Sequence, residues 1–82
     1  MNNPKKLSWE MEKIIEVAYQ LKVTGGTAAS TSERIAAAFV LDRQDCLPEG
    51  YDLIEAWDRL GSQWQQHVRL IKRDYMHRIE AE

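Results

Sequence analysis

The sequence predicts an all-α protein of three helices, over about residues 8–24, 31–45 and 52–80. Two observations support this fold class. Apolar residues recur at spacings of three and four along the first and last segments, and capping residues stand where the first two helices would begin. The chain has 82 residues, which suits one domain over residues 1–82. Folding of so small a domain buries only about 60–65% of the surface of the unfolded chain, so we expect marginal stability unless a partner contributes.

The first predicted helix begins after Ser8, whose hydroxyl suits an N-cap, and it carries Glu10 and Glu12 where the helix dipole favours acids. Trp9 projects from the side opposite the apolar stripe. The helix should end at Gly25-Gly26, because glycine adopts the left-handed C-cap conformation at little cost. The stripe consists of Leu7, Met11, Ile14, Ala18 and Leu21.

The stretch VTGGTAASTSERIAAAF, residues 23–39, raises the question of a phosphate-binding loop. A P-loop follows a strand and has the pattern GxxxxGK[ST], whereas these glycines follow a helix and no lysine lies between Lys22 and Lys72. The dinucleotide fingerprint GxGxxG is absent as well. We interpret the glycines as a hinge between two helices. The alternative is an anion site at the N-terminus of the second helix beside Arg34.

The second predicted helix opens with a capping box, in which Ser30 is followed three residues later by Glu33. The run IAAAFVL at residues 35–41 is apolar on all sides, which is typical of a central helix covered by its neighbours. A buried strand is the rival interpretation. Three consecutive alanines and the capping box favour a helix.

The segment LPEGYD, residues 47–52, predicts a turn with Pro48 at its first central position. A single helical phase then continues to the end of the chain, which predicts one helix over residues 52–80, bent at Gly61. A break at Gly61 with a new start at Ser62, giving a four-helix bundle, is the alternative. The residues that keep this phase are Leu53, Trp57, Leu60, Trp64, Val68, Ile71, Tyr75 and Ile79.

The residues that could carry chemistry form no recognisable catalytic, cofactor or metal site. Cys46 is the only cysteine, and His67 and His77 are too far apart along a helix to share a face as zinc ligands do. Acidic residues at positions 42, 45, 49, 52, 55 and 58 do not follow the calcium-loop pattern, so we interpret them as a solvated face. We therefore expect no enzyme activity and no cofactor.

Composition points to the cytoplasm. A lone cysteine suits a reducing compartment, Glu10 and Glu12 interrupt the position of a signal peptide's apolar region, and no stretch approaches about 20 apolar residues. A net charge of −2 argues against a surface built wholly for nucleic acid. One local basic face is the exception and makes a nucleic-acid-associated regulator the alternative function: Arg69, Lys72, Arg73 and His77.

The expected function follows from the length of the last helix. A straight helix over residues 52–80 would be about 43 Å long, whereas the first helix would span only about 23 Å. Part of the apolar stripe would then be left in water unless a second copy covered it. We therefore expect a homodimer and a protein-interaction, adaptor or regulatory module acting through a helical surface. The expected interaction residues are Trp57, Trp64, Val68, Ile71, Tyr75 and Ile79.

Overall fold

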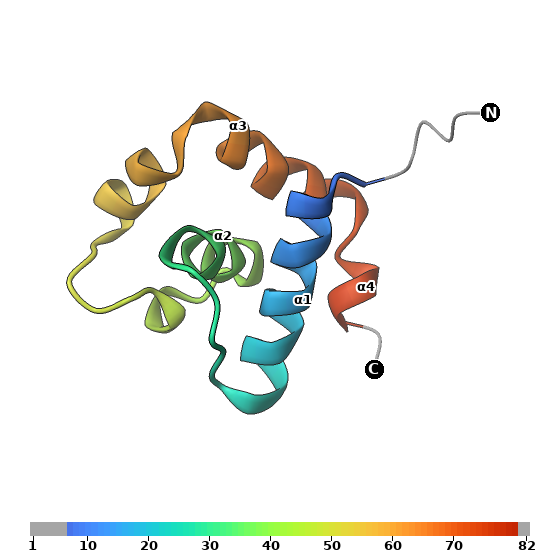
Figure 1. The fold of residues 1–82 in the computed structure, drawn as a ribbon, viewed down its shortest axis with the longest axis horizontal. Helices are drawn as coiled ribbons and strands as arrows, with labels where there is room; N and C mark the ends of the chain where they lie inside the picture. Colours follow the sequence, from blue (N-terminus) through green and yellow to red (C-terminus); the bar gives the residue numbers. More distant parts are fainter. Residues whose placement is uncertain (1–6, 81–82) are drawn as a thin grey trace.

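The structure, a computed structural model, describes residues 7–80, and these are helical with no strand among them. The order of elements is α1 (Trp9–Thr24), α2 (Thr31–Leu41), the 3-10 helix η1 (Gln44–Cys46), α3 (Leu53–Asp74) and α4 (His77–Glu80). Helix α2 lies in the centre, with α1 on one side and the start of α3 on the other (Figure 1). The all-α prediction is confirmed.

Helix α1 begins and ends where its capping residues predict. The Ser8 hydroxyl accepts a hydrogen bond from the Met11 amide at 3.2 Å, and Gly25 takes a φ of 82° as C-cap while its amide donates to the Leu21 carbonyl at 2.9 Å. The stripe from Met11 to Leu21 is buried, and Trp9 stands in solvent. The predicted glycine C-cap at the end of the first helix is confirmed.

Helix α2 carries the predicted capping box, with the Glu33 amide donating to the Ser30 hydroxyl at 3.2 Å and the Ser30 amide donating to the Glu33 carboxylate at 3.1 Å. Its residues from Ile35 to Ala38 are fully buried, as expected for a central helix. The helix ends at Leu41 and not near residue 45. Asp42 adopts the left-handed conformation, which aspartate tolerates better than most residues, and the chain leaves the helix there.

The turn before α3 lies one residue later than predicted. The Tyr51 amide donates to the Pro48 carbonyl at 3.4 Å, so Pro48 is the first residue of the turn, and Gly50 supplies its positive φ of 95°. Asp52 then caps α3, because its carboxylate accepts the Glu55 amide at 2.8 Å.

The helix predicted over residues 52–80 is interrupted at Gly61, where a bend or a break is expected, and it ends at Asp74 rather than continuing to Glu80. Gly61 has φ 79° and ψ 167°, a conformation that almost only glycine adopts, so α3 consists of two helical halves that meet at an angle. The Gln65 side-chain amide, from the second half of α3, donates to the Trp57 carbonyl of the first half at 2.7 Å. A second interruption follows Asp74, after which α4 turns back toward α1 (Figure 1).

These two interruptions wrap the apolar stripe around the core. Val68, Ile71 and Ile79 are buried within the chain at 2% exposure or less. Arg78 holds α4 on α1 through an ion pair with Glu12 at 3.0 Å, and Lys22 donates to the Ile79 carbonyl at 3.3 Å. No stripe overhangs the fold, so the length argument for a second copy does not apply to this structure.

Candidate protein-interaction surface

An aromatic pair lies at the surface where α2 meets the first half of α3. Phe39 is the half-buried exception in the otherwise buried centre of α2, and its ring meets Trp57 edge to face with centroids 5.0 Å apart. The Arg69 guanidinium, from the second half of α3, lies 5.3 Å from the centre of the Trp57 ring. Phe39 and Trp57 are therefore packed against neighbouring side chains and remain partly exposed to solvent.

Two hollows flank Phe39, and together we call them the Phe39 groove. The Leu53 hollow has a volume of about 300 Å³ and is lined by Ala38, Phe39, Asp42, Arg43, Gln44, Leu47 and Leu53. The Trp57 hollow has a volume of about 340 Å³ and is lined by Phe39, Asp42, Trp57, Val68, Arg69 and Lys72. Phe39 and Asp42 belong to both hollows and therefore separate them.

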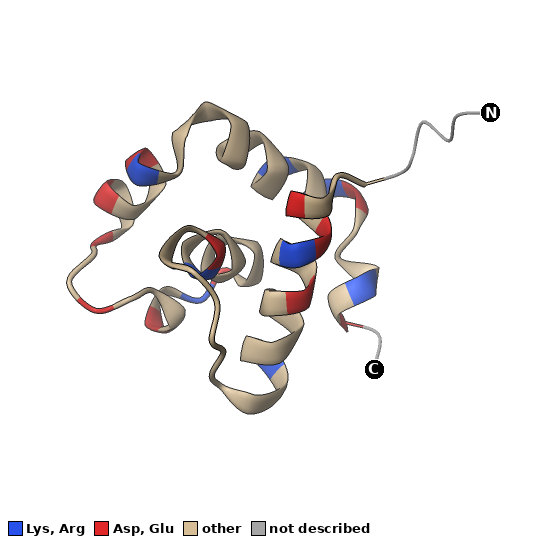
Figure 2. Ribbon diagram, in the orientation of Figure 1, with Lys and Arg blue, Asp and Glu red and all other residues tan. Residues whose placement is uncertain are grey.

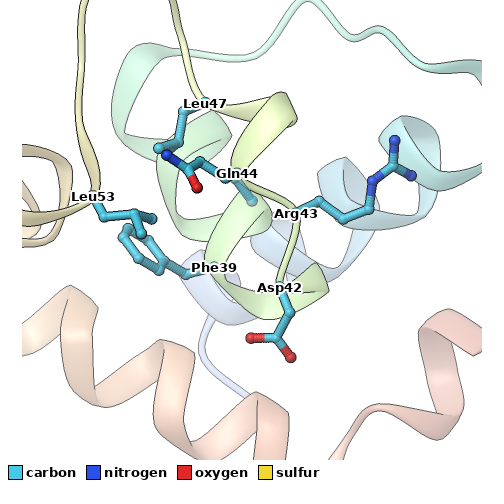
Figure 3. Close-up of a pocket in the computed structure, with 7 residues that line it drawn as sticks. Phe39, Asp42, Arg43, Gln44, Leu47 and Leu53 are labelled. Carbon is cyan, nitrogen blue, oxygen red and sulfur yellow. The ribbon is translucent and has the colours of Figure 1, made fainter.

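The left-handed C-cap of α2 positions the polar end of the groove. The Arg43 amide donates to the Ala38 carbonyl at 2.9 Å, which fixes the turn and directs the Asp42 side chain toward α3 (Figure 3). There the Lys72 ammonium meets the Asp42 carboxylate at 2.6 Å and the Phe39 carbonyl at 3.4 Å. The Arg43 side chain points away from Phe39 and pairs with Asp45 at 2.8 Å (Figure 3).

Exposed aliphatic side chains border the groove. Leu53 is 43% exposed, and Ile54, directly after it, is 74% exposed. Residues three and four apart are neighbours on a helix surface, so Ile54 lies beside both Trp57 and Asp58. Ile54 therefore extends the apolar surface outward to the point where acidic residues begin.

The segment of chain that supplies most of the groove is strongly acidic, although Asp42 is the one acid among the lining residues, with Arg43, Arg69 and Lys72. Residues 42–58 contain six Asp or Glu and one Arg, a net charge of −5 (1 − 6), in a chain whose net charge is −2. The positive charge of Arg43 offsets one of these six acids, Asp45. Hydrogen bonds from Arg43 also hold the pKa of the Asp45 carboxyl below its ordinary value. Within residues 7–80, Glu49, Glu55 and Asp58 have neither an ion pair nor a hydrogen bond from a cation. Figure 2 shows these acids along the turn and the start of α3.

The structure divides the predicted interaction residues into two groups. Trp57 lines the groove, whereas Val68, Ile71 and Ile79 are buried in the core and offer no open surface. The two others are half-buried elsewhere: Trp64 contacts His67, with ring centroids 6.1 Å apart, and Tyr75 contacts His77 at 6.3 Å.

The predicted basic face is not continuous, because α3 ends at Asp74 and His77 belongs to α4. Its cations are already occupied: Lys72 pairs with Asp42, Arg73 with Asp74 at 3.1 Å, and Arg69 lies on Trp57. Arg34, the cation of the anion-site alternative, donates to the Cys46 carbonyl at 3.0 Å. Each Lys and Arg side chain within residues 7–80 has such a partner.

The remaining candidate groups for chemistry are dispersed. Cys46 is buried with a free thiol, and His67 is buried with its Nε2 atom unpaired. In the part of the chain that the structure describes, no three His, Cys, Asp or Glu side chains are grouped closely enough to hold a metal ion. None of the helices within residues 7–80 is long and apolar enough to cross a membrane.

Sequence reasoning missed Phe39, Leu47, Leu53 and Ile54 as surface residues. Phe39 belongs to a run that is apolar on all sides, and such a run does not reveal which of its members the neighbouring helices leave uncovered. The adjacent pair Leu53-Ile54 did carry a signal. Two neighbouring residues of a helix point about 100° apart, so they cannot both face the centre of the core.

In comparisons with known proteins, no family model, no curated protein and no solved structure matches the chain.

Proposed function

We propose that the protein is a small cytoplasmic protein-interaction module, an adaptor or regulator, that binds a basic and apolar segment of another protein in the Phe39 groove. The observation that carries this proposal is the pair of apolar hollows beside Phe39, together with an acidic segment, residues 42–58, in which Glu49, Glu55 and Asp58 have no ion pair. Apolar contact supplies affinity, and charge of opposite sign steers association and selects the partner.

The exposed aliphatic residues set the scale of the affinity. Full burial of a Leu or Ile side chain is worth about 1.5–3 kcal/mol. Ile54 and Leu53 retain 74% and 43% of their exposure, so covering both contributes roughly 2–3 kcal/mol. This is enough for a transient complex when the two hollows are filled as well, and it is consistent with a regulatory contact.

A second copy of the chain suits this surface poorly. In a two-fold dimer the same surface meets itself, so Glu49, Glu55 and Asp58 would lie opposite like charges. The homodimer expected from the sequence also depended on an overhanging stripe, which the break at Gly61 removes. A different protein with Lys or Arg is the better occupant.

Nucleic acid is the weaker alternative for the same electrostatic reason. A phosphate backbone would need Arg69, Lys72 and Arg73 to exchange their partners within the chain, and Asp42 and Asp74 would repel it. No observation favours this function over protein binding, and none favours catalysis.

The test compares the natural chain with two variants as immobilised bait in a cell lysate. Ile54→Ser removes the exposed apolar side chain next to Leu53 without changing the charge. Val23→Ser is the matched control, because Val23 is 60% exposed on α1, which lies on the other side of α2 from the start of α3 (Figure 1). We expect a protein that is retained by the natural chain and by the control, lost on Ile54→Ser, and released at about 0.5 M salt.

Zero-length carbodiimide crosslinking then locates the contact, because it joins lysine amines of a partner to nearby carboxylates. Crosslinks should concentrate on Glu49, Glu55 and Asp58. Retention of the same partners by Ile54→Ser, or crosslinks confined to α1 and α4, would contradict the proposal.

A further inference from the structure

We propose that two copies of the chain exchange residues 62–80 at high concentration and form a two-fold dimer, with Gly61 as the hinge. In this dimer α3 is straight, and the second half of α3 and α4 of each copy pack on α1 and α2 of the other copy. The surface on which the two copies meet is thus the core of the closed monomer and not the Phe39 groove. The proposal therefore stands apart from the proposed function.

The hinge is a single residue at the surface. Within Leu53–Asp74, Gly61 is the one residue whose φ and ψ depart from the helical range. Gly61, Ser62 and Gln63 are exposed, and a Cβ atom built on Gly61 meets no atom within 4 Å, so close packing does not lock this point. Glycine adopts positive and negative φ about equally readily, so the same residue serves the broken and the straight helix.

The apolar residues on both sides of Gly61 keep one helical phase. Leu60 and Trp64 are four residues apart across the hinge, and Val68 and Ile71 continue at spacings of four and three. The closed monomer does not require this agreement, because the helix is broken between the two sets. A straight α3 with this pattern has one apolar face along its length, on which α1 and α2 of both copies can pack.

The segment beyond the hinge cannot stay undocked. It contributes Val68, Ile71 and Ile79 to the core, each at 2% exposure or less. Opening at Gly61 uncovers these side chains together with the faces of α1 and α2 on which they pack, and the hydrophobic effect opposes such exposure. A second open chain offers the same segment and the same faces, so both copies regain their cores through one reciprocal exchange.

Ion pairs that span the hinge can be remade between the copies. Lys72 pairs with Asp42 at 2.6 Å, and Arg78 pairs with Glu12 at 3.0 Å. Each pair joins a residue before Gly61 to one after it, so in the dimer each pair joins one copy to the other. The exchange therefore keeps the partners of these side chains and changes the backbone at the hinge.

Contacts next to the hinge are the exception. Two straight α3 helices cross at Gly61, and packed helices stand about 8–10 Å apart. Trp57 lies about one turn before the crossing, so the α3 helix of the second copy takes the space beside its ring. The exchanged dimer therefore lacks the Trp57 hollow, and the exchange excludes occupation of that hollow.

Refolding at two protein concentrations tests the exchange. Within one chain, residues 62–80 dock at an effective concentration on the order of 1 mM, so the closed monomer prevails in dilute solution. The natural chain refolded from urea at about 1 mM should give a dimer by size-exclusion chromatography with light scattering. Gly61→Ala should dimerise at a concentration at least tenfold lower, because alanine favours the helix about fivefold at each of two hinges. Gly26→Ala is the matched control and should behave as the natural chain.

Carbodiimide crosslinking of Lys72 to Asp42 distinguishes exchange from other kinds of dimer. Isotope-labelled and unlabelled natural chains are refolded together, and the purified dimer is crosslinked and digested. In an exchanged dimer, crosslinked peptides that contain residues 42 and 72 should include species with one labelled and one unlabelled half. Peptides whose two halves always carry the same label would overturn the proposal. A natural chain that remains monomeric after refolding at about 1 mM would overturn it as well.

Discussion

Replacing Gly61 with alanine should destabilise the protein by about 1–3 kcal/mol. Gly61 stands at φ 79° and ψ 167°, where a side chain is strained whatever the space around it. A Cβ atom built on this glycine meets no atom within 4 Å, so crowding adds nothing and the whole cost is conformational. Urea unfolding followed by circular dichroism measures this loss directly, because the slope of the transition should stay the same while its midpoint falls.

The same substitution favours the continuous helix that the sequence pattern suggests. Alanine is about 1 kcal/mol better than glycine inside a helix, so the balance between broken and straight forms shifts by roughly 2–4 kcal/mol in total. A straight α3 would expose Val68 and Ile71, which a second copy would then cover. Light scattering should show concentration-dependent association for Gly61→Ala and less association, or none, for the natural chain.

Gly26→Ala is the matched control. Gly26 is also an exposed glycine with open space around it, but it has no positive φ. Replacing Gly26 with alanine should leave the free energy of unfolding unchanged or raise it by up to about 1 kcal/mol, because alanine lowers the conformational entropy of the unfolded chain. If Gly61→Ala proved as stable as the natural chain, the strained break would not be part of the native fold, and the reasoning above would be wrong.

Three further predictions concern other parts of the chain. Gly25→Ala should cost about 1 kcal/mol or more by urea unfolding, because Gly25 caps α1 at a φ of 82°, and phosphate added to either form should leave the midpoint unchanged. Ile71→Ala should cost about 2–5 kcal/mol, since Ile71 is fully buried; a cost near zero would mean that it lies at the surface. Arg43→Gln should raise the pKa of Asp45 toward its ordinary value in an NMR titration, because the hydrogen bonds from Arg43 lower it. A carboxyl with a lowered folded pKa stabilises the fold above its unfolded pKa and loses that contribution as pH falls through the folded pKa, so the natural chain should lose it only in acid.

Helix termini could be predicted from the sequence because their causes are local. Ser8, the Ser30 and Glu33 box and Gly25 each act within four residues of the group they satisfy, and all of them cap as predicted. The end of α2 shows the limit of this approach. Asp42 takes the left-handed conformation that glycine usually supplies at a helix C-terminus, and the Arg43 amide donates to the Ala38 carbonyl, so no glycine marks this end in the sequence.

The break at Gly61 could not be predicted from periodicity, because a periodic pattern reports which residues are buried and not whether the helix is continuous. Both halves of α3 pack against α2, so each half needs its own apolar face. The two faces can keep the same periodicity along the sequence even though the helix is broken between them. The groove is hidden for a related reason. Its residues come from four separate segments of the chain, which only the fold brings together around Phe39.

The groove and the break at Gly61 depend on each other. The Trp57 hollow takes Trp57 from the first half of α3 and Val68, Arg69 and Lys72 from the second. In a straight helix Trp57 and Arg69 would be twelve residues and about 18 Å apart along the axis. In the structure the Arg69 guanidinium lies 5.3 Å from the centre of the Trp57 ring. The conformation that closes the core therefore also builds the binding surface, so Gly61→Ala should weaken binding of the partner in proportion to the straight form that it populates. Unchanged retention of the partner by a variant that light scattering shows to be associated would mean that the partner binds outside this groove.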